Sequence, residues 1–122
     1  MGLPGIRGDR IQLQQVLLNL ISNSFDAIEP GQKAREIAIR TSSEDNGFVL
    51  TAVKDSGTGI LAKNMPKLFS HFFTSKPDGL GMGLSISRSI IDSHGGSLSV
   101  ENNPDAGATF YFTLPTSKKE RR

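Results

Sequence analysis

Cysteine is missing from this 122-residue sequence, and histidine occurs only twice, as His71 and His94. Without cysteine the chain has no disulfide, no thiolate nucleophile and no cysteine-ligated zinc, which is compatible with a reducing compartment. Because the two histidines are far apart in the chain, a histidine metal cluster is not expected. The common thiol and histidine site types are therefore excluded as starting hypotheses.

Long apolar runs are also missing. No stretch approaches the length of a membrane span, and no basic-then-apolar leader marks a secreted chain. We therefore expect a cytoplasmic domain that makes no membrane contact of its own. The sequence leaves open whether a longer parent protein is anchored in a membrane.

Strong charge of one sign is missing too. The net charge is +2, and much of it lies in the tail residues 118–122. Such a tail is usually solvated, so nucleic acid is not an expected partner. The length suits one domain with a single core. We expect a lead segment at residues 1–8, one domain at 9–116 and a basic tail at 117–122.

Asp9, followed by Gln12 three residues later, predicts the start of a helix that runs to about Ile28. Its apolar side chains surround most of the helical wheel, which predicts a mostly buried helix. The narrow polar stripe includes Asn19 and Asn23, one turn apart. Buried amides must be hydrogen-bonded, so this pair either caps neighbouring backbone or faces a polar cavity, and an ordinary structural role is the default. The apolar side chains are Ile11, Leu13, Val16, Leu17, Leu18, Leu20, Ile21, Phe25 and Ile28.

Alternation of apolar and polar residues predicts four strands in the rest of the chain. Asn46-Gly47 is a hairpin signal between the first two. One long helix followed by two antiparallel strands predicts an α+β layered fold. The expected strands are residues 36–42, 48–54, 97–101 and 108–114.

Between the two pairs of strands, residues 61–76 predict a short helix interrupted at Pro66, followed by a loop that could serve as a lid. A second long helix is expected at residues 85–93. Its pattern predicts Ser85 in water and Ile86, like the other isoleucines, facing inward.

Three glycines at alternate positions, Gly79, Gly81 and Gly83, open into this second helix. Glycine lets the backbone approach a ligand closely, and a helix start offers unpaired N–H groups and a positive dipole end. The pattern therefore suits a phosphate. On spacing alone, a flexible loop or tight turn is an equal alternative.

Asp55 stands at the end of the second expected strand, followed by Gly57 and Gly59. A carboxylate at this position can accept a hydrogen bond from an exocyclic amine such as that of adenine. The two glycines would let the backbone pass close to a flat ring. An ordinary Asp-Ser-Gly turn is the alternative, and composition does not choose between the two.

Taken in order, these stretches resemble the motifs of the ATP-binding catalytic domain of bacterial sensor histidine kinases. That family belongs to the gyrase, Hsp90, histidine kinase and MutL superfamily, and the resemblance extends from about Asp9 to Pro115. It implies a Bergerat-type two-layer α/β sandwich, in which helices cover one face of a mixed, mostly antiparallel sheet. Residues 15–23 resemble the N box, 55–59 the G1 box, 68–76 the F box, 79–84 the G2 box and 107–115 the closing strand.

The resemblance also implies roles for individual residues. Asn23 would coordinate Mg²⁺ through its side-chain oxygen, and Asn19 would support the phosphates or the water shell of the metal. Asp55 would bind the adenine amino group, with Thr109 helping through water. Lys76, beside the lid, would contact the γ-phosphate and complete a catalytic set with the two asparagines. The remaining ATP contacts would come from Gly57, Gly59, Ile60, Phe73, Thr74, Gly79, Leu80, Gly81, Met82, Gly83 and Leu84.

ATPases of the superfamily carry a glutamate general base one turn before the metal asparagine, and here that position is Asn19. An amide cannot act as a general base. We therefore expect the domain to bind Mg-ATP, to hydrolyse it poorly and to donate the γ-phosphoryl group to a histidine elsewhere. The alternatives are an ATPase or serine kinase of the same superfamily, or an inactive module that binds a nucleotide or a partner.

The implied partner is a histidine-bearing dimerisation domain of the parent kinase, with a response regulator receiver domain following indirectly. The isolated domain is expected to be a monomer. Neither His71 nor His94 has the acidic neighbour of a phosphoacceptor, so we expect packing or surface roles for both. Ser24 replaces a usual alanine, and Ser70 and His71 stand where Glu and Pro are frequent, which bears on the rigidity of the lid.

Overall fold

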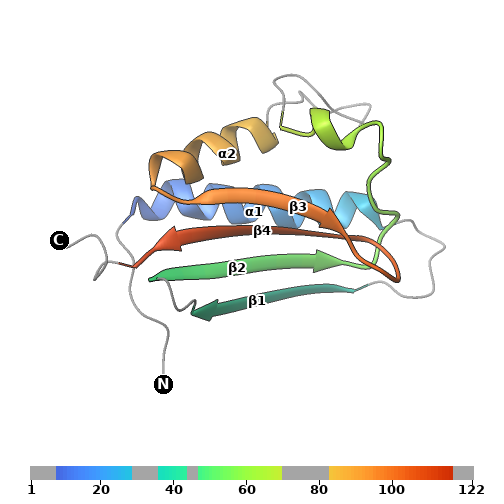
Figure 1. Ribbon diagram of the computed structural model, residues 1–122, viewed down its shortest axis with the longest axis horizontal. Helices are drawn as coiled ribbons and strands as arrows, with labels where there is room; N and C mark the ends of the chain where they lie inside the picture. Colours follow the sequence, from blue (N-terminus) through green and yellow to red (C-terminus); the bar gives the residue numbers. More distant parts are fainter. Residues whose placement is uncertain (1–7, 29–35, 44–46, 70–82, 117–122) are drawn as a thin grey trace.

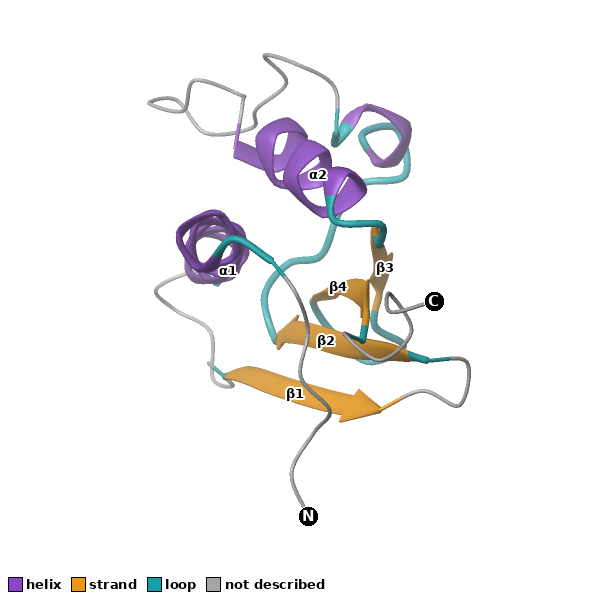
Figure 2. Ribbon diagram, turned by 90° about the vertical axis from the view of Figure 1, so that its left-hand side faces the viewer, coloured by secondary structure: helices purple, strands orange, loops and turns teal. Residues whose placement is uncertain are grey.

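The computed structural model describes residues 8–28, 36–43, 47–69 and 83–116. In these residues four strands form one sheet, and the two α-helices lie together on one of its faces (Figure 1, Figure 2). This confirms the predicted α+β layered fold. None of these helices is long and apolar enough to cross a membrane. The elements are α1 (Arg10–Ala27), β1 (Ile37–Ser43), β2 (Phe48–Asp55), the 3-10 turn η1 (Met65–Lys67), α2 (Gly83–Ser93), β3 (Ser97–Asn102) and β4 (Ala108–Pro115).

The sheet has the strand order β1-β2-β4-β3, and all three pairings in the described ranges are antiparallel. β1 and β2 form a hairpin. Gly47, the residue before β2, has a φ of 85°, in the left-handed region that glycine tolerates. β2 is an inner strand, so Val53 is paired with Ile39 on one side and Phe110 on the other. The candidate carboxylate, Asp55, is the last residue of this inner strand.

The start of α1 follows the prediction in one half of the capping box only. The Asp9 carboxylate accepts a 3.0 Å hydrogen bond from the N–H of Gln12. In a full capping box the Asp9 N–H would bond the Gln12 side chain. Here it donates to Nε2 of His94, 3.0 Å away. The start of α1 is thus attached to the residue that follows α2.

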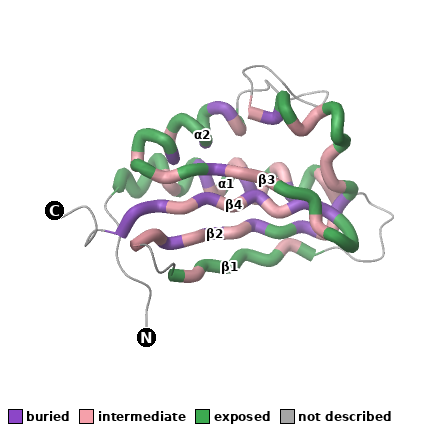
Figure 3. Tube along the Cα trace, viewed as in Figure 1, coloured by how far each residue is buried: buried purple, intermediate pink, exposed green. Residues whose placement is uncertain are grey.

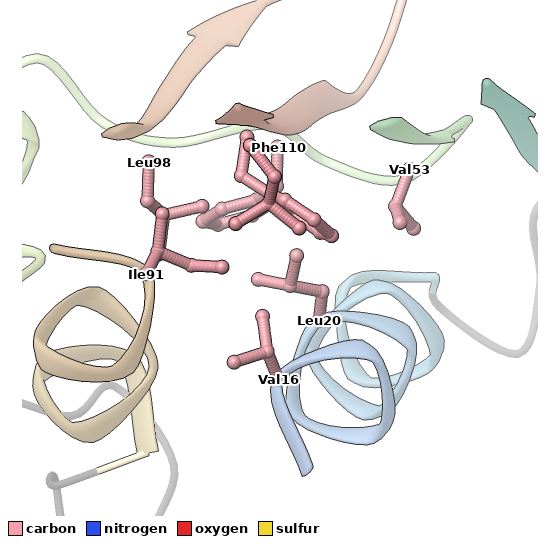
Figure 4. Packing of buried hydrophobic residues seen from close by; sticks show 8 residues of the cluster. Val16, Leu20, Val53, Ile91, Leu98 and Phe110 are labelled. Atoms are coloured by element: carbon pink, nitrogen blue, oxygen red, sulfur yellow. The ribbon is translucent and has the colours of Figure 1, made fainter. Parts of the chain in front are cut away.

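The core fills the space between the helices and the sheet. Val16 and Leu20 of α1 and Ile91 of α2 meet Val53 and Phe110 of the sheet (Figure 4). Alternate residues of β2 and β4 point into this layer, as the period of two in a strand requires. The buried cluster consists of Val16, Leu20, Val53, Ile91, Leu98, Phe110, Phe112 and Leu114.

The prediction that α1 is mostly buried is wrong. Ile11, Leu18 and Phe25 are 76%, 62% and 65% exposed. In a two-layer fold a helix is covered only on the side that meets the sheet and the neighbouring helix, and much of α1 is accordingly exposed (Figure 3). The apolar residues of α1 occupy a wider arc than that side. The fully buried residues of α1 are Val16, Leu20 and Ser24.

α2 turns its predicted apolar side inward, since Leu84, Ile90 and Ile91 all pack on the core, but two of its residues differ from the prediction. Ser85 and Ser87 are buried, whereas Ile86 is 42% exposed. Ser87 faces α1, where its Oγ accepts a 3.0 Å hydrogen bond from Asn19 Nδ2. Small side chains at this contact let the two helices approach each other. Ile91 points into the core, as predicted.

Replacing Leu20 with alanine should destabilise the fold much more than the same change at Leu18. Leu20 is fully buried, so its truncation leaves a cavity and should lower the free energy of unfolding by about 2–5 kcal/mol. Leu18 is 62% exposed, and its truncation should cost less than about 1 kcal/mol. Urea unfolding of the two variants measures the difference. Equal losses would mean that α1 does not pack on this side.

Candidate functional site

The polar stripe of α1 faces the start of α2. Asn19 Nδ2 donates to the carbonyl oxygen of Gly83, 3.3 Å away, and to Ser87 Oγ at 3.0 Å. Gln15, one turn earlier on α1, donates from Nε2 to Asn19 Oδ1 at 3.2 Å. Gly83 is the first residue of α2 and the last glycine of the predicted phosphate stretch. The stripe and that stretch therefore meet at Asn19.

Asn23 lies half-buried one turn further along α1. The neighbouring Ser24 is fully buried, and within the described part of the chain its Oγ is the one buried side-chain polar atom without a hydrogen-bond partner. A side-chain amide offers the hard oxygen ligand that Mg²⁺ accepts. The described residues contain no group of three His, Cys, Asp or Glu side chains that could hold a metal.

Asp55 is only 2% exposed, and its carboxylate is fixed by the backbone. Oδ1 accepts hydrogen bonds from the N–H groups of Gly57 at 2.8 Å and Ala108 at 3.2 Å. No hydrogen bond to Oδ2 occurs among the described residues. One oxygen thus sets the orientation of the side chain, and the other is an acceptor with a fixed direction.

The loop after Asp55 is attached to the end of α1. The N–H of Thr58 donates to the carbonyl oxygen of Ala27 at 3.1 Å. Gly57 lies so close to α1 that a Cβ added to it would stand 2.4 Å from the same oxygen. On the other side, the N–H of Ser56 donates to the carbonyl oxygen of Glu36 at 3.1 Å. The loop is therefore held between α1 and the residue that precedes β1.

α1 joins the two predicted ligand regions. Asn19 contacts the end of the glycine stretch, and Ala27 contacts the loop after Asp55. Their separation along the helix axis is about 12 Å, from the rise of an α-helix. An elongated ligand with a ring bearing an amino group at one end and anionic groups at the other would match this order of groups.

Two residues for which the sequence predicts no role also belong to this site. Both groups of the Asn102 side-chain amide bond to the backbone of Ile60, and Asn103 Nδ2 donates to the carbonyl oxygen of Asp55 at 3.0 Å. The partners lie 42 and 48 positions apart in the sequence. No local pattern could have indicated these bonds.

The structure does not bring the Thr109 hydroxyl to Asp55. Thr109 is paired with Lys54, on the face of the sheet away from the helices, whereas Ala108 and Phe110 are buried on the helical side. The Thr109 hydroxyl donates instead to Asn103 Oδ1. A water-mediated contact between Thr109 and an adenine ring therefore does not fit this geometry. The backbone N–H of Ala108 takes the place beside the carboxylate.

The structure also describes three other residues predicted to contact ATP: Gly59, Ile60 and Leu84. Gly59 adopts a φ of 79°, a left-handed conformation. The side chains of Ile60 and Leu84 are half-buried and pack against the core cluster. Phe73, Thr74, Lys76, Gly79, Leu80, Gly81, Met82 and also His71 lie outside the described residues.

His94 has the packing role that the sequence predicts. Its Nδ1 lies 2.8 Å from the carbonyl oxygen of Ile90, and its Nε2 accepts from the N–H of Asp9. Because a carbonyl oxygen can only accept, Nδ1 must carry the proton. Nδ1 thus fixes the ring to α2, and Nε2 joins it to the start of α1.

Comparison with known proteins extends this description. The family model of the histidine kinase-, DNA gyrase B- and HSP90-like ATPases matches residues 8–118. The chain is 44% identical to the sensor protein FixL of Bradyrhizobium diazoefficiens, over 92% of this chain and 22% of that protein. The solved catalytic domain of histidine kinase ThkA matches with a TM-score of 0.81 and 37% identity, over 95% of this chain and 74% of that chain. Full-length ShkA, solved in complex with AMPPNP, matches with a TM-score of 0.78 and 30% identity, over 93% of this chain and 23% of that chain.

The fold and these matches thus define a histidine kinase-like ATPase domain, in which helices cover one face of an antiparallel sheet. The chain belongs to the histidine kinase-, DNA gyrase B- and HSP90-like ATPase family, and it is of the histidine kinase type found in sensor kinases. This confirms the resemblance identified from the motifs. The chain spans about a fifth of the length of FixL, at 22%.

Alanine at Gly57 should destabilise the domain, whereas alanine at Gly83 should not. A Cβ at Gly57 would stand 2.4 Å from a backbone oxygen, while at Gly83 the nearest atom would be 3.8 Å away. Backbone cannot move aside cheaply, so we expect Gly57→Ala to lose about 1–3 kcal/mol. Gly83→Ala should be neutral or stabilising by up to about 1 kcal/mol, because alanine favours helix. Thermal unfolding compares the two, and equal stabilities would argue against a loop packed on α1.

Proposed function

We propose that this domain binds Mg-ATP and donates the γ-phosphoryl group to a histidine on a separate dimerisation domain. The observation that carries the proposal is that one helix, α1, is hydrogen-bonded to the Asp55 loop near one end and to the start of α2 further back. The adenine would lie at the Asp55 loop, and the phosphates would lie toward α2. The similarity to FixL and ThkA supports this reading.

The adenine end rests on the fixed carboxylate of Asp55. Its Oδ1 is occupied by two backbone N–H groups, which leaves Oδ2 to accept from the exocyclic amino group of adenine. A buried charged acceptor with a set direction favours an amino group and disfavours a carbonyl at the same position. The site should therefore prefer adenine to guanine. The glycines after Asp55 would let the loop backbone lie along the ring.

The phosphate end rests on the amides of α1 and on the N-terminus of α2. The first N–H groups of a helix have no partner within the helix, and they attract anions. Asn23 would provide an oxygen ligand to Mg²⁺, whose other ligands would be phosphate oxygens and water, as Mg²⁺ prefers. Bound Mg²⁺ would neutralise charge on the phosphates. Lys76 stays a predicted contact of the γ-phosphate.

The chemistry proposed for this end needs positioning more than base catalysis. Asn19 stands where ATPases of the superfamily carry a glutamate, and here its Nδ2 is already engaged with Gly83 and Ser87. An amide cannot take a proton from water. A neutral imidazole nitrogen needs no such help to attack phosphorus: the N–P bond forms, the bond to the bridging oxygen breaks, and ADP leaves. A response regulator would then receive the group from the histidine.

Titration calorimetry with ATP tests the two ends of the site separately. Asp55→Asn replaces the acceptor Oδ2 with an amide NH2, so that two donors face each other where the adenine amino group binds. This change should weaken ATP binding at least about tenfold. Asp105→Asn, the same change at an exposed acid, is the control and should bind normally. Asn23→Ala should keep metal-free ATP binding but lose the gain in affinity that Mg²⁺ gives. Binding that is insensitive to Asp55 would contradict the adenine assignment.

Phosphoryl transfer tests the proposed reaction. With ATP, Mg²⁺ and an added histidine-bearing dimerisation domain, we expect acid-labile phosphohistidine on the added domain. Without that domain, phosphate release should be slow, because the domain lacks a general base at Asn19. Replacing the acceptor histidine with glutamine is the control. Rapid phosphate release without an acceptor would favour an ATPase instead, and nucleotide binding without transfer to any acceptor would favour a binding module.

A further inference from the structure

Two adjacent asparagines bind the two ends of the loop that follows Asp55. Asn102 is the last residue of β3, and Asn103 follows it. Asn103 bonds to the backbone of Asp55, where the loop begins, and Asn102 bonds to the backbone of Ile60, where it ends. We call this pair the asparagine clip. It contacts Asp55 and Ile60, whereas α1 contacts Gly57 and Thr58 between them.

The Asn102 side chain satisfies both backbone groups of one residue. Its Oδ1 accepts from the N–H of Ile60 at 2.8 Å, and its Nδ2 donates to the carbonyl oxygen of Ile60 at 2.9 Å. This is the pair of bonds that a neighbouring strand would provide. Gly59, directly before Ile60, has a left-handed conformation and lies close to Asn102. A Cβ added to Gly59 would stand 3.1 Å from Asn102 Oδ1, which is a tight contact. Beyond the end of the sheet, the Asn102 amide thus makes the two backbone hydrogen bonds that a neighbouring strand would make.

The Asn103 side chain fixes the turn that leads into β4. Its Nδ2 donates to the carbonyl oxygens of Asp55 at 3.0 Å and Ala106 at 2.9 Å. Its N–H donates to the carbonyl oxygen of Gly107 at 2.9 Å. Gly107 passes so close to Asp55 that an added Cβ would stand 2.1 Å from its carbonyl oxygen. Asn103 is therefore part of the packing of the sheet end, whereas Asn102 is exposed and acts on the loop alone.

We propose that Asn102 is a positioning residue for the nucleobase, holding the loop backbone at Ile60 in the conformation that receives the adenine ring. The inference rests on the proposed function. Asn102 touches no group assigned to the nucleotide except through the Ile60 backbone. Its effect is to order the loop before binding, so that less conformational entropy is lost when the ring arrives. Asp55 provides the recognised acceptor, and the clip sets the distance of the loop from it.

Asn102→Ala tests this role, with Asn64→Ala as the matched control. Asn64 precedes η1, and its side chain makes no capping hydrogen bond. We expect Asn102→Ala to weaken ATP and ADP binding by roughly three- to twentyfold through lost pre-organisation. The ratio of ATP to GTP affinity should fall as well, because a displaced loop no longer holds the ring against Asp55. The ratio of affinities with and without Mg²⁺ should not change, and Asn64→Ala should behave as wild type.

Three results would overturn the proposal in spite of intact folding. The first is ATP affinity within twofold of wild type. The second is an equal loss for ATP and GTP, which would indicate general loosening of the site. The third is a loss of the Mg²⁺ effect together with ATP affinity, which would place the change at the phosphate end. A midpoint of urea unfolding close to that of Asn64→Ala confirms that the variant is folded.

Hydrogen exchange at the Ile60 amide tests the clip without any nucleotide. In the wild type this N–H should be protected by Asn102, and in Asn102→Ala it should exchange at least about tenfold faster, while β2 amides such as that of Val53 stay protected. Fast exchange in the wild type would overturn the clip whatever the domain binds. If the clip is present but no nucleotide binds to the wild type, the proposed function fails and the positioning role fails with it, while the loop geometry stands.

Discussion

The packing of α1 on the inner strand β2 is the contact on which the rest of the structure depends. Val16 and Leu20 meet Val53 in a layer closed to water, which is the main source of stability in a domain of this size. The same packing brings Ala27 against Thr58, so the loop after Asp55 is attached to the helix that forms the core. Stability and the candidate site therefore share one interface.

α1 performs two tasks because its sides are chemically different. One side enters the core, and the adjacent stripe carries Asn19 to the first turn of α2. The small residues of α2 make this approach possible, and the hydroxyl of Ser87 satisfies the amide that it meets. A polar contact between two helices would be costly without that partner. The bond from the Asp9 N–H at the start of α1 to His94 also fixes the two helices relative to each other. Their relative position in turn places Gly83, the last glycine of the stretch, beside Asn19.

The candidate adenine end is built mostly from backbone groups. The Asp55 carboxylate is oriented by the N–H groups of Gly57 and Ala108, and the loop is held by Ala27 of α1 and by the asparagine clip. Backbone hydrogen bonds to a buried carboxylate are strong and hold it in one direction. A ligand that meets such a group binds with little loss of freedom in the protein. The proposed phosphate end differs in its chemistry, because there a helix N-terminus and side-chain amides would meet a charged, hydrated group.

Local pattern and motif order determined the elements and the family of this protein. The Asp9 cap, the turn at Gly47 and the period of two in β2 and β4 act between near neighbours, so they can be read from the chain. The same alternation indicates where the Thr109 side chain points: as the neighbour of the buried Phe110, it must face the other side of the sheet. What only the tertiary structure decided is how far the buried side of each helix extends and which distant residues hold the Asp55 loop. Ser87 is buried where it meets Asn19 of α1, while Ile86 stays exposed. Asn102 meets Ile60 because the fold brings together residues 42 positions apart, which no pattern near either residue could indicate.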